Sequence, residues 1–165
     1  MKPNIEVVES SPQWRALPGI EKLARRGIEA SLEMSGIRIL DGAEVSVQLV
    51  DDSQIRALNA QWRGLDKPTN VLSFPASAPE KIAAAPMLGD IVMAFETAER
   101  EAAEEGKTLA DHAAHLVVHG FLHLLGFDHQ IAADANRMEA LETRILAKLR
   151  IADPYALTVP LGANA

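Results

Sequence analysis

Three histidines in the second half of the chain have a spacing that suits binding to one metal ion. His119 and His123 lie four residues apart, and His129 follows after a glycine, Gly126. On an α-helix, residues four apart lie on the same face, so both imidazoles can reach a single ion. Gly126 can adopt a positive φ, end the helix and bring His129 back as a third ligand. Three imidazoles suit Zn²⁺ and leave a fourth position open, which is typical of a catalytic zinc site.

Neighbouring polar side chains each have more than one interpretation. His112 and His115 continue the same helical stripe toward the N-terminus, but nothing after them supplies a third ligand. We therefore expect them to be surface residues or hydrogen-bond partners of the ligands. Asp128 can accept a hydrogen bond from a ligand imidazole, or it can cap the turn that precedes His129.

The spacing H-x-x-x-H-x-x-G-x-x-H also matches that of the metzincin metalloproteases. In those enzymes a glutamate follows the first histidine and takes the proton of the zinc-bound water. This chain has Gly120 at that position, so a peptidase built on it would lack its general base. The pattern therefore indicates a coordination geometry rather than a protease mechanism, and a metalloprotease of unusual type is kept as an alternative.

Length and composition favour a single globular domain. A chain of 165 residues can bury about two-thirds of its unfolded surface around one core. The absence of cysteine excludes disulfides and thiolate ligands. The sequence has no apolar run of transmembrane length and no secretory signal at its N-terminus, so we expect a cytoplasmic protein that does not contact membranes. We predict one domain over residues 1–150 and a frayed tail over 151–165.

The net charge of −7 at pH 7 is not typical of a protein that binds nucleic acid. Such proteins usually need a basic surface that displaces the counterions of the phosphates. Binding to RNA would therefore depend on local basic patches. The candidates are Arg63 with Lys67, and a group made of Lys22, Arg25, Arg26 and Arg38.

The hydrophobic pattern predicts an α/β (α+β) fold, with a mixed sheet of about four strands and helices packed on it. The strands are expected at residues 5–9, 44–50, 71–74 and 88–95. The helices are expected at residues 18–34, between the caps at 51–53 and Gly64, and at 96–106, 108–125 and 134–149. Residues 75–87 are rich in proline and alanine without periodicity, and we predict an exposed, mobile loop there.

Three blocks of sequence in a fixed order give a more specific indication. HGFLHLLGFDH at 119–129 resembles HGxLHLxGYDH, the signature of the YbeY family of endoribonucleases, known as rRNA maturation factors. NAQWRGLDKPTNVLSF at 59–74 resembles the family's N-x-x-[FYW]-R-x-x-D-x-x-T-D-V-L-S-F, and LGDI at 88–91 resembles its L-G-D-I strand. Phe127 and Asn70 stand where the family usually has tyrosine and aspartate. The resemblance covers residues 40–148.

The resemblance implies a zinc-dependent endoribonuclease that acts on single-stranded RNA. Its roles would be rRNA maturation, notably at the 3′ end of the small-subunit RNA, and ribosome quality control. The implied ligands of one Zn²⁺ per chain are His119, His123 and His129, and the family's important arginine corresponds to Arg63. A metal and a guanidinium can both stabilise the charge that grows on a phosphodiester during cleavage. The implied partners are the ribosome and possible ribosomal proteins or assembly factors, with no DNA.

Two alternatives come from the residues themselves. Arg63 can be an ordinary residue at a helix end that pairs with Asp66. The chain can also be a non-catalytic ribosome-assembly factor whose metal stabilises the helix–turn geometry. Its acidic charge would then suit docking on a basic ribosomal protein.

Overall fold

A computed structural model describes residues 2–155. Its four strands are β1 (Asn4–Glu9), β2 (Glu44–Val50), β3 (Val71–Pro75) and β4 (Met87–Ala94). They form one sheet in the order β1-β2-β4-β3, in which β3 runs antiparallel to β4 and the other pairs are parallel. The predicted class, a mixed sheet of four strands with packed helices, is confirmed. Strand β3 forms one edge of the sheet.

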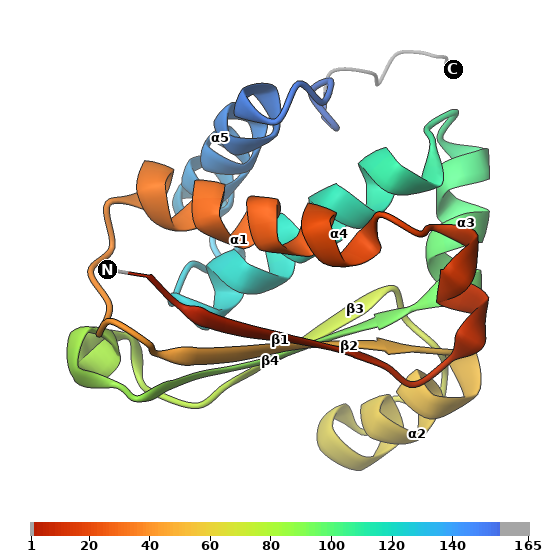
Figure 1. Ribbon diagram of the computed structural model, residues 1–165, viewed down its shortest axis with the longest axis horizontal. Helices are drawn as coiled ribbons and strands as arrows, with labels where there is room; N and C mark the ends of the chain where they lie inside the picture. Colours follow the sequence, from red (N-terminus) through yellow and green to blue (C-terminus); the bar gives the residue numbers. More distant parts are fainter. Residues whose placement is uncertain (1, 156–165) are drawn as a thin grey trace.

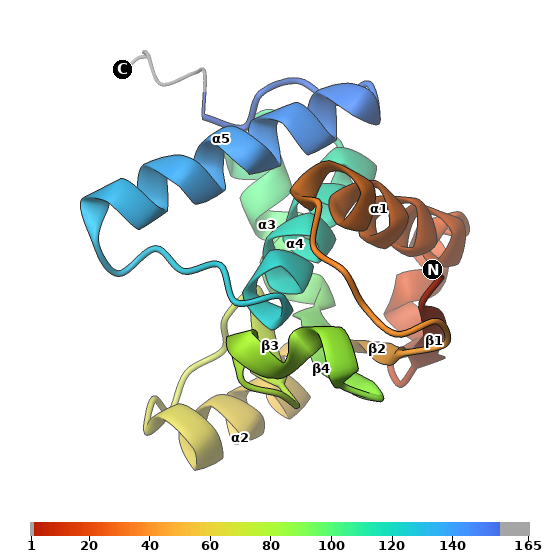
Figure 2. The same ribbon diagram turned by 90° about the vertical axis from the view of Figure 1, so that its left-hand side faces the viewer.

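The helices cover the two faces of the sheet unequally. They are α1 (Ile20–Ser35), α2 (Asp52–Arg63), α3 (Phe95–Glu104), α4 (Leu109–Leu124) and α5 (Ala132–Lys148). Figure 1 shows α1 and α4 on one face and α2 on the other, and Figure 2 shows α5 packed on α1 and α4, away from the sheet. The larger apolar core lies between the sheet and α1 with α4, and a smaller one lies under α2.

Helix α4 is buried on most sides and lies unusually close to the sheet. Thr108 caps its N-terminus by accepting a hydrogen bond from the Asp111 backbone N–H, as predicted. At Gly120 an added Cβ would lie 2.9 Å from Cγ2 of Ile91 in β4. On the β3 side, the Ser73 hydroxyl donates a hydrogen bond of 2.9 Å to the Gly120 carbonyl oxygen. Glycine thus allows the close approach that holds α4, and the histidines on it, against the sheet.

Helix α2 has well-defined ends that agree with the prediction. Asp51 and Gln54 form a reciprocal capping box at its start, and Gly64 ends it with φ 71°. Ile55 is fully buried against the sheet. Asp52 accepts hydrogen bonds from the backbone N–H and hydroxyl of Thr97, which tie the start of α2 to α3.

Two short 3₁₀ helices were not predicted. Residues Pro79–Ala84 form one of them, so the prediction of a loop without regular structure over 75–87 was wrong there. Most residues of this segment are exposed, as predicted, but Ile82 is only 3% exposed in the main core. A single apolar residue among prolines and alanines has no periodicity that could have revealed it. Pro12–Ala16 form the other, where Trp14 is fully buried and its indole N–H donates to the Val50 carbonyl oxygen at 2.9 Å.

The predicted tail of 151–165 lies partly outside the described residues, which end at 155. Ile151 donates its backbone N–H to the Leu146 carbonyl oxygen, and Tyr155 reaches Glu142 on α5. Within the described range, no helix has the length and apolar character needed to cross a bilayer.

Candidate metal centre

The structure brings His119, His123 and His129 together at the C-terminal end of α4. One nitrogen of each imidazole lies within 4.8 Å of the others. The Nε2 atoms of His119 and His123 are 3.2 Å apart. Two nitrogens bound to one tetrahedral Zn²⁺ at 2.0–2.1 Å would be about 3.3 Å apart. The donor set and its spacing therefore fit a zinc ion, and the exposed His129 leaves the cluster open to solvent on one side.

Local backbone geometry produces this arrangement. His119 and His123 are one turn apart on α4, and Gly126 adopts φ 101° just after the helix ends. The resulting turn stacks the His129 ring on that of His119, with centroids 5.6 Å apart. Asp128 accepts a hydrogen bond of 2.6 Å from the His129 backbone N–H. Of the two interpretations of Asp128, this contact favours the cap of the turn.

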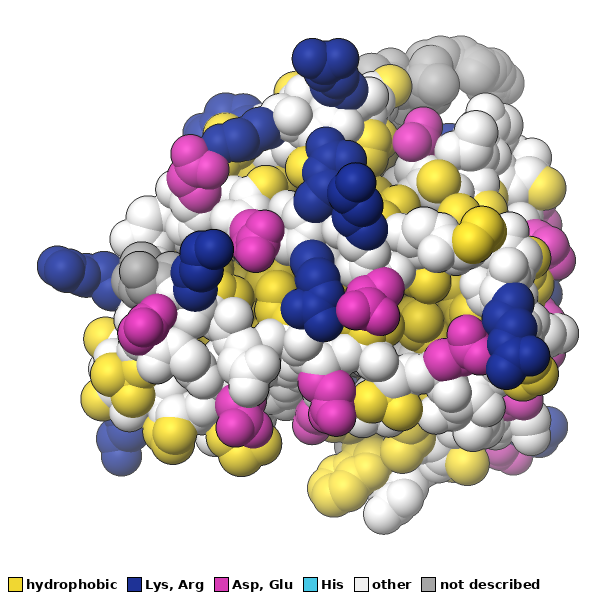
Figure 3. Space-filling model, viewed as in Figure 1, with side chains coloured by type: hydrophobic (Ala, Val, Ile, Leu, Met, Phe, Trp, Pro, Cys, Tyr) yellow, Lys and Arg dark blue, Asp and Glu magenta, His cyan; other side chains and the backbone are white. Residues whose placement is uncertain are grey.

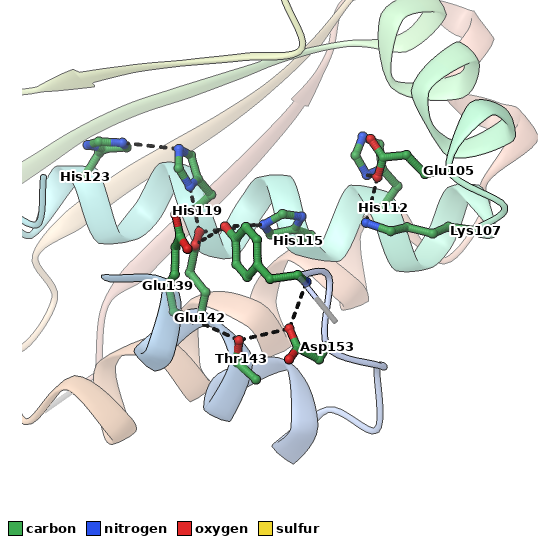
Figure 4. A network of polar contacts seen from close by, with 11 residues as sticks. Glu105, Lys107, His112, His115, His119, His123, Glu139, Glu142, Thr143 and Asp153 are labelled. Atoms are coloured by element: carbon green, nitrogen blue, oxygen red, sulfur yellow. Dashed lines mark hydrogen bonds and ion pairs between the residues drawn. The ribbon is translucent and has the colours of Figure 1, made fainter. Parts of the chain in front are cut away.

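A buried carboxylate orients the first histidine. Glu142 on α5 is fully buried, and its Oε2 lies 2.6 Å from Nδ1 of His119. An ionised carboxylate only accepts hydrogen bonds, so Nδ1 must carry the proton and Nε2 keeps its lone pair. Figure 4 shows Glu142 against His119, with His123 one turn further along α4. Glu142 therefore selects the tautomer that a metal at Nε2 requires.

Two more side chains complete the environment of Glu142. The Tyr155 hydroxyl donates to Oε1 of Glu142, and His115 Nε2 lies 3.3 Å from the Tyr155 oxygen. Burial by itself would raise the pKa of Glu142, but the His115 and His119 imidazoles and the Tyr155 hydroxyl lower it to about 2. The carboxylate is therefore ionised at neutral pH. His115 lies in this network as a hydrogen-bond partner, which is one of the roles expected for it.

The second histidine of the cluster, His123, is neutral at neutral pH. Burial, followed by the charges of His119 and His129, lowers the pKa of His123 to about 4. An imidazole with such a pKa keeps a free lone pair at neutral pH, so no proton has to leave it before a metal binds.

Two other residues singled out in the sequence lie away from this cluster. His112 is buried, and its Nε2 donates to Glu101 on α3 at 2.9 Å, which makes it a link between helices. Arg63 is exposed at the end of α2, on the opposite face of the sheet from α4. Asp66 pairs with Arg56 at 2.8 Å, so the alternative in which it pairs with Arg63 is wrong.

An acidic groove of about 870 Å³ extends from His119 along α4 toward the α3–α4 connection. The charged residues that line it are mainly carboxylates, namely Glu101, Glu104, Glu105, Asp111 and Asp153, with Lys107. Phosphates would be repelled there, so a nucleic acid would approach the histidines from another side.

Comparison with known proteins shows which family the chain belongs to. The family model described as Endoribonuclease YbeY matches residues 10–150. The chain belongs to this family. The resemblance seen in the three sequence blocks is thereby confirmed, and the match also includes the N-terminal part that those blocks did not cover.

Curated relatives agree over nearly the full chain. Endoribonuclease YbeY of Methylocella silvestris is 52% identical over 155 residues, which cover 94% of this chain and 87% of that protein. Endoribonuclease YbeY of Azorhizobium caulinodans is 51% identical, covering 93% of this chain and 96% of that protein. The solution structure of TM1509 from Thermotoga maritima matches with a TM-score of 0.55 and 24% identity, over 89% of this chain and 92% of that one. That likeness supports the fold alone.

Sequence reasoning missed Glu142 and Tyr155. A signal for Glu142 was present, because it lies on the apolar line of α5 with Met138, Leu141 and Ile145, where a charged residue must have a buried partner. Tyr155 follows the last helix in a segment predicted to be frayed, and nothing in its sequence position indicates a contact with α5.

Proposed function

We propose that this chain is a metal-dependent endoribonuclease that cleaves single-stranded RNA. Membership of the endoribonuclease YbeY family supports the activity. The observation that carries the metal dependence is the triad itself, with His119 held by buried Glu142 and its Nε2 placed 3.2 Å from that of His123. The proposed role is rRNA maturation in the cytoplasm, notably at the 3′ end of the small-subunit RNA, together with ribosome quality control.

The proposed cofactor is one Zn²⁺ per chain, held by His119, His123 and His129. When bound, it would act as a Lewis acid and lower the pKa of coordinated water. Imidazole ligands also suit Ni²⁺ and Co²⁺, so the choice of zinc rests on ligand type and spacing. Glu142 holds the tautomer of His119, and Arg63 is proposed to bind a phosphate through its planar guanidinium.

The metalloprotease alternative loses support at Gly120. A glutamate there would have to act as the general base, but a Cβ at this position would already lie 2.9 Å from Ile91 and 3.2 Å from the Ser73 hydroxyl. The tight contact between α4 and the sheet leaves no room for a side chain. RNA has less need of such a base, because its own 2′-hydroxyl can attack the phosphate.

The test combines metal content with cleavage of a labelled RNA that carries the small-subunit 3′ end. We expect wild-type protein to hold one zinc per chain and to cleave, and His123→Ala to lose the metal and more than about 100-fold of the cleavage rate. Gln130→Ala, an exposed residue in the same turn, serves as the control and should retain both.

Two outcomes would contradict the proposal. Full cleavage by metal-free His123→Ala protein would exclude a metal-dependent mechanism. Metal binding by wild type without cleavage, either of free RNA or of RNA in the ribosomal particle, would favour the non-catalytic assembly factor.

A further inference from the structure

The end of α2 exposes a large aromatic side chain. Trp62 is 63% exposed, whereas the chain's other tryptophan, Trp14, is fully buried. Figure 3 shows hydrophobic side chains protruding at the bottom of the molecule, over α2. A largely exposed indole at a helix end is a candidate contact for a ligand when other features of the surface support it.

Phe74 supports Trp62 from one side. Ile55, Leu58 and Trp62 lie on one line of α2, and the first two pack on the sheet while Trp62 extends toward its edge. The ring of Phe74 in β3 contacts it edge-on, with centroids 6.2 Å apart and an interplanar angle of 66°. Phe74 thus holds the Trp62 indole in place, and much of the indole stays accessible for stacking. We call this pair the Trp62–Phe74 platform.

Two cationic side chains that follow Trp62 closely in the chain are not neutralised. Arg63 follows Trp62 directly, and Lys67 lies in the next loop; both are exposed, and neither forms a side-chain hydrogen bond or ion pair with any residue in 2–155. The acidic Asp66 between them is paired with Arg56. An aromatic face beside unpaired cations is the arrangement with which proteins bind single-stranded nucleic acid.

Strand β3 connects the platform to the histidines. Successive side chains of a strand point to opposite faces, so Phe74 faces α2 while Ser73 faces α4. Ser73 donates to the carbonyl of Gly120, the residue after His119. Because β3 is an edge strand, a polynucleotide can cross its free edge and reach both faces. The groove on the other side of His119 is acidic, so this edge is the electrostatically favourable approach.

We propose that Trp62, backed by Phe74, stacks on a base of single-stranded RNA, while Arg63 and Lys67 bind the adjoining phosphates. The platform positions the strand that enters the histidine cluster across β3. This inference rests on the proposed endoribonuclease function and adds a base-binding position to it. Stacking on an aromatic ring accepts any base, so the platform would contribute affinity more than sequence preference.

The tryptophan itself is the probe. The ligand is a short single-stranded oligouridylate whose 2′-O-methyl groups prevent attack by the 2′-hydroxyl. It is titrated into the protein as purified and into the protein after chelation of metal. Since Trp14 is buried, a change in tryptophan fluorescence reports on Trp62. We expect quenching that saturates with binding. An abasic oligomer of the same length should bind more weakly and quench little, because it carries the phosphates without the bases.

Variants separate stacking from simple exposure. Trp62→Ala should weaken binding of the oligouridylate about tenfold or more, measured with a labelled oligomer, and Trp62→Phe should restore most of it. Leu65→Ala, another exposed apolar residue in the same region at 40%, should bind like wild type. Both positions are exposed, so the three variants are expected to fold.

The inference is overturned if wild type binds the oligouridylate without quenching, if it does not bind it at all, or if Trp62→Ala binds as tightly as wild type. Loss of metal-dependent cleavage in His123→Ala would still establish the endoribonuclease in each of these cases. Conversely, quenching that depends on bases in a protein that never cleaves RNA would keep the platform and reject the enzyme.

Discussion

The two faces of strand β3 are built in opposite ways. On the inner face, Ser73 and α4 are packed so tightly that Gly120 has no room for a Cβ, and the neighbouring His119 is oriented by the fully buried Glu142. On the outer face, Phe74 meets Trp62, which is 63% exposed beside two unpaired cations. The inner face is closed by protein contacts. On the outer face the Trp62 indole stays largely exposed, and the Arg63 and Lys67 side chains have no hydrogen-bond or ion-pair partner within residues 2–155.

This difference corresponds to two kinds of chemistry. A metal needs ligand atoms at fixed distances, so its ligands must be held by packing and hydrogen bonds before it arrives. A flexible RNA strand adapts to a surface, and it needs accessible aromatic faces and charges instead. Variants on the inner face should therefore change metal binding, whereas variants on the outer face should change RNA binding and cleavage.

The largest expected effect on the outer face is that of Arg63→Ala. A lost hydrogen bond to a charged phosphate is worth roughly 1.5–3 kcal/mol, so cleavage should fall about tenfold to a hundredfold while zinc content stays unchanged. Arg15→Ala removes an exposed cation that Glu9 already neutralises and leaves the Arg56–Asp66 pair intact, so it should change cleavage little. Zinc loss in Arg63→Ala would contradict the proposal that metal binding and RNA binding are separated on the two faces.

On the inner face, Glu142→Gln should lower zinc affinity about tenfold, because partners of ligand histidines typically contribute tenfold to a hundredfold. Competition with a chelating dye measures this directly. RNA binding by the platform should be unaffected. Glu139→Gln, an exposed residue of the same helix, is the matched control. Unchanged zinc affinity in Glu142→Gln would mean that the histidine tautomer is held by other contacts.

The smallest functional effect is expected where packing alone matters. Gly120→Ala places a Cβ 2.9 Å from Ile91 and should destabilise the fold by about 1–3 kcal/mol in urea unfolding of the metal-free protein. Gly27→Ala, in α1, meets Val117 at an ordinary 3.4 Å and should be neutral or slightly stabilising. Equal stability of the two variants would show that α4 is free to move away from the sheet.

The fold was largely predictable because its elements carry local signals. The alternation of Val45, Val47 and Leu49 marked β2, and the Thr108 cap marked the start of α4. The two 3₁₀ helices were missed because Trp14 and Ile82 are single apolar residues whose burial depends on distant parts of the chain. Periodicity cannot report a contact made by one residue.

The histidine cluster could also be read from the chain, because its three members lie on one helix and the turn after it. By contrast, Glu142 and Tyr155 join the cluster only through the packing of α5 on α4 and the return of the chain after α5. Arg63 was expected near the chemistry, but the sheet separates α2 from α4, which the local sequence does not encode.

By itself, therefore, the sequence determined the elements, the donor set and the family resemblance, all of which depend on residues close together along the chain. Only the tertiary structure decided that His119 is protonated at Nδ1 and that no side chain fits at Gly120. It also decided that Trp62 lies exposed, and Arg63 unpaired, across β3 from the histidines. These features depend on contacts between segments far apart in sequence, where packing and burial, rather than local propensity, set the energies.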